Sequence, residues 1–204
     1  CAACTTNSVV VHSNLTLVVA VLTWLCTVRN NETGCVFPVA ETAALLRERK
    51  SRALLHCDAV QGFMKVPFAA KTLGADLISV SYHKIHGPKG IGALITQESV
   101  RLEPSHIGGG QENGMRSGTE GTPAIFGFAA ACEVGKVTFA EDIAREKALL
   151  GGLVEKLCKL EGLKINGAHE APHILSLSVP GLPTQNSINI LQDAGICVSA
   201  GSAC

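Results

Sequence analysis

The sequence lacks a net charge, because 17 lysines and arginines balance 17 aspartates and glutamates. Without an excess of either sign, the chain has no field that attracts nucleic acid or an anionic membrane over a distance. We therefore expect no nucleic-acid partner. The longest uncharged apolar stretch, Leu15–Val28, is shorter than the roughly 20 residues that a membrane-spanning helix needs, so no membrane span is expected.

Paired CxxC motifs are also missing, since only Cys1 and Cys4 form a CxxC. An odd number of cysteines without paired spacing argues against a zinc site and against a disulfide framework. We expect no metal and a reducing, cytoplasmic compartment. The first residue is Cys rather than Met, and no Lys or Arg precedes Arg29 to form the positive region of a signal peptide, so we expect the sequence to be a fragment. The nine cysteines lie at positions 1, 4, 26, 35, 57, 132, 158, 197 and 204.

Hydrophobic residues make up 47% of the chain, enough for a substantial core. Short apolar runs that end in polar clusters are typical of strands in a largely buried sheet. Longer segments with helical periodicity lie between and after these runs. The pattern predicts an α/β fold whose functional groups gather at strand ends. The expected strands are 53–57, 77–81, 91–96, 173–179 and 196–200, and the expected helices begin near 38, 122, 141 and 185.

Lys84 follows one of these predicted strands, close to Ser81, His83 and the turn Gly87–Gly90. A lysine at the end of a buried strand can be partly desolvated, which favours the neutral amine that forms an imine. Ser81 and His83 can donate hydrogen bonds to an anion such as a phosphate. By spacing alone, a solvated loop lysine with a chance Ser and His is the commoner explanation.

Asp58 ends another predicted strand and is followed by Gln61. A carboxylate at this place can pair with a protonated pyridine nitrogen and keep the ring cationic, so that the ring accepts electrons. Taken alone, an aspartate at a strand end also fits a turn or a helix cap. The residue pattern leaves both interpretations open.

Six runs in a fixed order nevertheless resemble the landmarks of one family, the class V aminotransferases, and within it the NifS/IscS-type cysteine desulfurases. Their order and separations, over residues 30 to 204, are far more specific than any single run. The runs are Asn30–Gly34, His56–Gln61, Ser81–Gly90, Gly108–Glu112, Arg116–Glu120 and Gly201–Cys204.

The resemblance implies a pyridoxal 5'-phosphate (PLP) enzyme of the PLP-dependent transferase fold, fold type I, with an incomplete large domain. Residues 1–138 would be part of the PLP-binding large domain, with 1–28 matching poorly, and residues 139–204 part of the small C-terminal domain. Lys84 would be the Schiff-base lysine and Cys204 the sulfur acceptor. The other implied cofactor-binding residues are Asp58 at the pyridine nitrogen, Gln61 and Asn31 at the phenolic oxygen and the substrate side, Ser81 and His83 at the phosphate, and Thr119 at the phosphate of the neighbouring subunit of a homodimer.

The implied reaction converts L-cysteine to L-alanine and leaves a persulfide on Cys204. A sulfur-acceptor protein, such as an iron-sulfur scaffold, or a small thiol would collect this sulfur. The mobile Gly201–Ser202 loop suits both attack and handover, and the attack needs a thiolate. The alternatives are a selenocysteine lyase or another class V PLP lyase, or a non-catalytic fragment of a desulfurase.

The chain departs from the family pattern chiefly in length, because family members are about twice as long. Missing are the upstream Gly/Thr phosphate loop, the histidine that stacks on the cofactor ring, and the downstream arginine that binds the substrate carboxylate. His12 has the wrong surroundings for the stacking role. Tyr82 and Asn113 also differ from the family's usual residues, but neither change removes a proposed catalytic atom.

Overall fold

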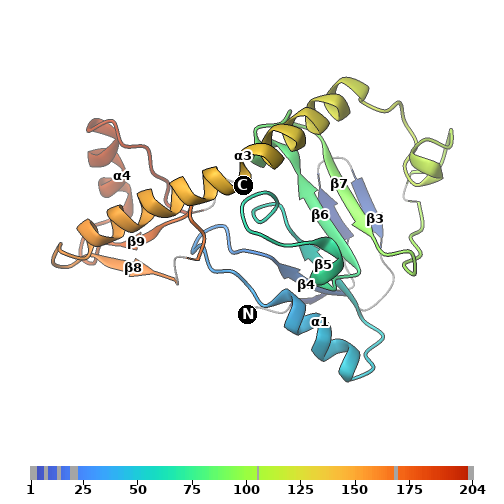
Figure 1. Cartoon of the computed structure of the whole chain (residues 1–204), viewed down its shortest axis with the longest axis horizontal. Helices are drawn as coiled ribbons and strands as arrows, with labels where there is room; N and C mark the ends of the chain where they lie inside the picture. The colour runs from blue at the N-terminus through green and yellow to red at the C-terminus, as the bar shows by residue number, and fades with distance from the viewer. Residues whose placement is uncertain are drawn as a thin grey trace. The chain divides into compact units, whose positions relative to one another are not determined.

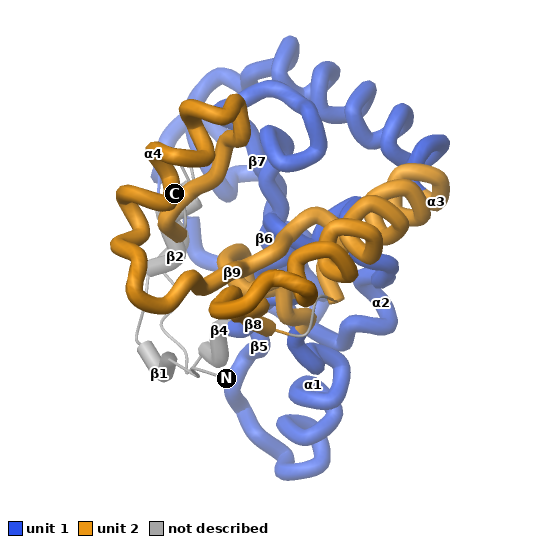
Figure 2. Tube along the Cα trace, turned by 90° about the vertical axis from the view of Figure 1, so that its left-hand side faces the viewer, with its two compact units in different colours: residues 1–28, 37–139 blue, residues 29–36, 140–204 orange. Residues whose placement is uncertain are grey.

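The computed structural model describes residues 4–6, 9–12, 15–18, 23–104, 106–167 and 170–201. The chain divides into two compact units, which Figure 2 colours separately. Unit 1 consists of Cys1–Val28 and Phe37–Phe139, and unit 2 of Arg29–Val36 and Ala140–Cys204. The short segment 29–36 therefore leaves unit 1 and belongs to unit 2.

A five-stranded mixed sheet forms the centre of unit 1, with the order β1-β4-β5-β6-β7. Figure 1 labels four of these strands, β4 to β7. The middle strands β4, β5 and β6 are parallel, and β1 and β7 pair antiparallel at the two edges. A separate hairpin joins β2 to β3. The strands are β1 (Cys4–Thr6), β2 (Val9–His12), β3 (Leu15–Val18), β4 (Thr23–Thr27), β5 (Leu54–Asp58), β6 (Leu77–Ser81) and β7 (Gly92–Thr96).

Strand register gives the sheet two different faces. Because Cys57 pairs with Ile78, the alternate residues Leu55, Cys57, Ile78 and Val80 all point to one face, and that face is apolar. Leu55, Cys57, Ile78 and Val80 are buried in one core cluster together with Val39 and Ala43 of helix α1 (Val39–Glu48). The opposite face carries the polar alternates of the same strands, namely His56, Asp58, Ser79 and Ser81.

Polar contacts fix the connections between the strands. Helix α1 ends near Arg47, whose Nη2 donates to the carbonyl of Gly74 at 2.7 Å. Gly74 closes the short helix α2 (Ala70–Leu73) in the left-handed conformation, at φ 72°. Asp76 then accepts a hydrogen bond from the Leu55 amide at 2.7 Å, which ties the start of β6 to the start of β5. These contacts set the register that the two faces depend on.

Helix α3 (Thr122–Leu157) runs through the boundary between the units. The sequence pattern predicts two helices here, and this prediction is wrong. A glycine such as Gly135 lowers the stability of a helix by only about 1 kcal/mol relative to alanine, so it does not end the helix. Helix α3 is long and apolar enough to cross a membrane. This is weak evidence for a membrane span, because core helices of soluble proteins meet the same criteria of length and composition. Two short 3-10 helices, η1 (Tyr82–Ile85) and η2 (Glu112–Gly114), precede it.

Unit 2 contains a small hairpin and a second helix. Strand β8 (Lys164–Asn166) pairs antiparallel with β9 (Ser176–Ser178), and α4 (Thr184–Asp193) follows. The strand expected at 196–200 does not form, and Ile196 and Val198 are exposed there without a neighbouring strand among the described residues. An apolar run becomes a strand only where another strand edge accepts its hydrogen bonds.

Candidate functional site

The neighbouring parallel strands β5 and β6 end side by side, and their last residues carry polar groups of the candidate site. Asp58 ends β5 and pairs in register with Ser79 of β6, two residues before Ser81. The Ala59 amide donates to the carbonyl of Ser79 at 2.9 Å, so the two chains stay together past the end of β5. Because side chains alternate along a strand, Asp58 and Ser81 lie on the same face of the sheet, at the carboxyl ends of β5 and β6. We call this end of the two strands the sheet edge.

The turn after Asp58 is built to hold that carboxylate in place. Asp58 Oδ1 accepts a hydrogen bond from the Val60 amide at 2.9 Å, an Asx-type turn. Gly62 lies against Val28, where an added Cβ would come within 2.6 Å of Val28 Cγ1, so only glycine fits. Gln61 is half-buried in this turn, between the two fixed points.

Lys84 lies in η1, directly after β6. At the start of η1, Ser81 Oγ lies 2.8 Å from His83 Nδ1. At its end, His86 adopts the left-handed conformation, with φ 64°, and the Gly87 amide donates to the Tyr82 carbonyl at 3.0 Å. Tyr82 itself is buried and stacks on Phe128 of α3. The half-buried Lys84 is thus carried by a turn anchored at both ends.

A further polar pair lies within β5 and β6, just before the strand ends, and it was not predicted from the sequence. His56 Nε2 lies 3.1 Å from Ser79 Oγ, and both side chains are buried on the same face as Asp58. The alternation of polar and apolar residues in β5 is the signal that could have identified His56 as an inward-facing group. This pair satisfies polar atoms that would otherwise be costly to bury.

The remaining candidate residues lie elsewhere. Thr119 is exposed in the loop of unit 1 that precedes α3, next to Gly118, whose amide donates to Gln111 Oε1 at 3.2 Å. Asn31 is exposed in the turn of unit 2 that begins at Asn30. Cys204 lies outside the described residues. Five of the candidates thus lie at or directly after the adjacent carboxyl ends of β5 and β6, namely Asp58, Gln61, Ser81, His83 and Lys84.

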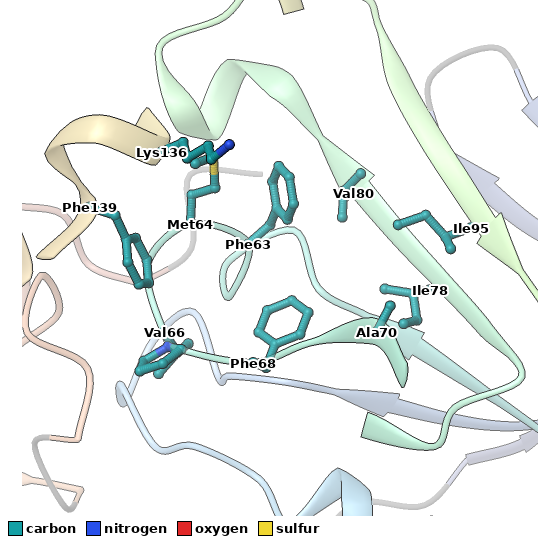
Figure 3. A pocket seen from close by; sticks show the side chains of 11 residues that line it. Phe63, Met64, Val66, Phe68, Ala70, Ile78, Val80, Ile95, Lys136 and Phe139 are labelled. Carbon is teal, nitrogen blue, oxygen red and sulfur yellow. The ribbon is translucent and has the colours of Figure 1, made fainter. Parts of the chain in front are cut away.

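Unit 1 also has a hollow of about 620 Å³ on the apolar face of the sheet (Figure 3). Ile78, Val80 and Ile95 form its floor, and Phe63 and Phe68 project into it from the segment after the Asp58 turn. Lys136 is the one charged residue of its lining. Because Asp58 and Ser81 point to the other face, this hollow is not part of the candidate site.

The cluster at the sheet edge combines a carboxylate, a hydroxyl, an imidazole and an amine. Such a set can bind a compact molecule that has a cationic nitrogen at one end, an anionic group at the other and a carbonyl that reacts with an amine. In the part of the chain that the structure describes, no three His, Cys, Asp or Glu side chains are grouped as metal ligands. The chemistry of these side chains fits a phosphorylated pyridine aldehyde.

Comparison with known proteins gives a consistent result. A family model described as "Aminotransferase class-V" matches residues 14–204. A cysteine desulfurase from Nostoc sp. is 39% identical over 178 residues, covering 86% of this chain and 44% of that protein. The mitochondrial cysteine desulfurase of Saccharomyces cerevisiae is 39% identical over 179 residues, covering 86% of this chain and 35% of that protein.

A solved structure of a NifS-like protein from Rickettsia africae superposes with a TM-score of 0.82 at 34% identity. The superposition covers 88% of this chain and 50% of that chain. The chain thus spans between about a third and a half of the length of these relatives, and the matched part contains the ends of β5 and β6.

Thiol labelling tests whether Cys57, the residue before Asp58 in β5, is packed in the core. Burial, with smaller contributions from Cys26 and Asp58, raises the pKa of Cys57 to about 12, so the reactive thiolate is scarce near neutral pH. We expect iodoacetamide at about pH 8 to alkylate the exposed Cys158 and Cys197 and to leave Cys57 unmodified, as read by peptide mass spectrometry. Denatured chain, in which Cys57 must react, is the control. Alkylation of Cys57 as fast as Cys158 in the folded chain would contradict this packing.

Proposed function

The chain belongs to the class V aminotransferase family and has part of the PLP-dependent transferase fold, fold type I, and we propose that it is the cofactor-binding part of a cysteine desulfurase. The observation that supports this most is the placement of Asp58 and Ser81 on one face of adjacent parallel strands, with Lys84 in the turn that follows. PLP supplies an aromatic ring that withdraws electrons from the substrate's Cα.

Each side chain at the sheet edge has a role that follows from its chemistry. The Asp58 carboxylate, already oriented by the Val60 amide, accepts a hydrogen bond from the pyridine nitrogen and favours its protonated state. The hydroxyl of Ser81 and the imidazole of His83, which lie 2.8 Å apart, donate hydrogen bonds to the phosphate. Gln61 and Asn31 bind the phenolic oxygen and the substrate side, and Thr119 binds the phosphate of a neighbouring subunit in a homodimer.

Lys84 has two tasks in this proposal. Its amine bonds covalently to the cofactor, and it also takes and returns the proton at the substrate's Cα. The turn of η1, fixed by the buried Tyr82 and by the hydrogen bond from Gly87 to Tyr82, keeps the amine near the strand end while the side chain moves. Because Lys84 is only half-buried, its amine stays accessible to substrate.

Cys204 completes the reaction. Its thiolate attacks the sulfur of L-cysteine, the substrate's Cβ–S bond breaks, and its electron pair stays on carbon, which is protonated to give L-alanine. The new S–S bond leaves a persulfide on Cys204, from which a sulfur-acceptor protein or a small thiol takes the terminal sulfur. We also propose a cytoplasmic location, because the odd number of cysteines without paired spacing argues against a disulfide framework.

We also propose that the two units correspond to the two domains of the fold. Unit 1, with its mixed sheet, corresponds to part of the large PLP-binding domain, and the α3 end, β8, β9 and α4 of unit 2 correspond to part of the small C-terminal domain. Cofactor contacts from Asp58, Ser81 and Lys84 would then all come from unit 1.

Covalent trapping tests the cofactor assignment. The chain is incubated with PLP and reduced with borohydride, and the modified peptide is identified by mass spectrometry. We expect the adduct on Lys84, loss of the adduct in Lys84→Ala, and an unchanged adduct in Lys89→Ala, a matched control because Lys89 is exposed in the same segment. Adduct formation elsewhere, or none in the unmodified chain, would contradict the assignment and favour a non-catalytic fragment.

Sulfur transfer is tested separately at the cysteine. Where the chain turns over L-cysteine, Cys204→Ala should lower persulfide formation roughly 100-fold or more, because removing a nucleophile removes the step it performs. Cys197→Ala, which alters an exposed thiol outside the Gly201–Cys204 run, should leave the rate unchanged. Persulfide or sulfide formation that survives in Cys204→Ala would instead favour a selenocysteine lyase or another class V lyase.

A further inference from the structure

The η1 turn that carries Lys84 begins with a ring that is packed on helix α3. Tyr82, the first residue of η1, is only 3% exposed, and its ring stacks on that of Phe128 of α3 with an angle of 22° between the two planes. Tyr82 belongs to the same core cluster as Val80. The alternation of side chains in β6 thus continues into the turn, and it places the Tyr82 ring in the core immediately before Lys84.

The other end of the turn rests on the same helix. Gly87 lies so close to α3 that an added Cβ would come within 3.5 Å of Ala131 Cβ. Pro88 packs directly on the helix backbone, because a Cβ added to Gly127 would come within 3.1 Å of Pro88 Cγ. Gly127, Phe128 and Ala131 lie on one face of α3, since residues three and four apart are neighbours on a helix surface. Both ends of the turn are therefore seated on one face of one helix.

Tyr82 also closes the turn through its backbone. Its carbonyl accepts hydrogen bonds from the amides of His86 and Gly87, the latter at 3.0 Å. Lys84 lies inside the loop of chain that these hydrogen bonds close. The residue whose ring stacks on Phe128 is thus the same residue whose carbonyl fixes the backbone around Lys84.

We propose that Tyr82 and Phe128 are positioning residues for Lys84, because their stacked rings hold the η1 turn on α3 and so keep the Lys84 amine at the end of β6. Neither ring touches cofactor or substrate in this proposal; both act through the turn. The inference rests on the proposed function, in which Lys84 is the residue that bonds to PLP. All residues that carry it belong to unit 1.

The contribution of the ring pair sets the size of the expected effect. Stacking of two aromatic side chains favours their packed arrangement by roughly a factor of two to ten beyond the burial of their area. Burial raises the pKa of Tyr82 to about 12, with smaller contributions from Cys132 and Glu112, so its phenol is uncharged near neutral pH. Phenylalanine at this position keeps an uncharged ring and should hold the turn, whereas leucine should not.

Hydrogen exchange of the whole chain tests the anchor without cofactor. In Tyr82→Leu and in Phe128→Leu, which keep an apolar side chain but lose the ring pair, protection of the His86 and Gly87 amides should fall roughly two- to tenfold. Protection of the β6 amides should stay unchanged in both variants. Tyr82→Phe, which keeps two rings, should behave as the unmodified chain. So should Phe68→Leu, a matched control that changes another aromatic side chain packed on the same core cluster.

Two results would overturn the proposal. One is unchanged protection of the turn in both leucine variants, because the rings would then not hold it. The other is an equal loss of protection in β6, because the substitutions would then lower the stability of the whole sheet rather than release the turn.

Competition between two lysines of the same segment then tests the consequence for Lys84. With limiting PLP followed by borohydride, the ratio of adduct on Lys84 to adduct on the exposed Lys89 should fall roughly two- to tenfold in Tyr82→Leu and Phe128→Leu and stay the same in Tyr82→Phe. One ratio shared by all these proteins would overturn the link to Lys84. Absence of any adduct on Lys84 in the unmodified chain would count against the proposed function instead, and the exchange experiment would still decide whether the rings hold the turn.

Discussion

The parallel register of β5 and β6 is the constraint on which the rest of the site depends. The pairing of Asp58 with Ser79 brings two strand ends together, and the two-residue alternation sends Asp58 and Ser81 to one face while Cys57 and Val80 pack into the core on the other. A shift of one residue in β5 would turn the Asp58 carboxylate to the apolar face, and the same shift in β6 would turn Ser81 there. The polar site and the hydrophobic core are therefore two consequences of the same hydrogen-bonded ladder.

Much of this arrangement could be predicted from the sequence because its signals are local. Short apolar runs ending in Asp58 and Ser81 predict β5 and β6, and the structure confirms both strands with nearly the expected bounds. The family relationship and the α/β fold are likewise confirmed. The roles of individual site residues stay predictions, since they depend on a cofactor and on side chains such as Cys204 beyond the described residues.

What the sequence could not predict depends on contacts between distant residues. Tyr82 and Phe128 lie far apart in the sequence, and no periodicity indicates that their rings stack. His56 appears as an ordinary strand residue until the register places it beside Ser79. The continuity of α3 was missed for a different reason, because a single glycine weakens a helix without ending it, and the change from unit 1 to unit 2 occurs inside that helix rather than at a loop.

The central claim, that Asp58 at the shared strand edge faces a pyridine nitrogen, is tested most directly by nitrogen NMR of the cofactor. The chain is loaded with PLP labelled with nitrogen-15 in the ring, and the chemical shift reports whether that nitrogen is protonated. The account predicts a protonated nitrogen near neutral pH in the unmodified chain and an unprotonated one in Asp58→Ala. Identical shifts in the two proteins would contradict it, because the carboxylate would then have no contact with the ring.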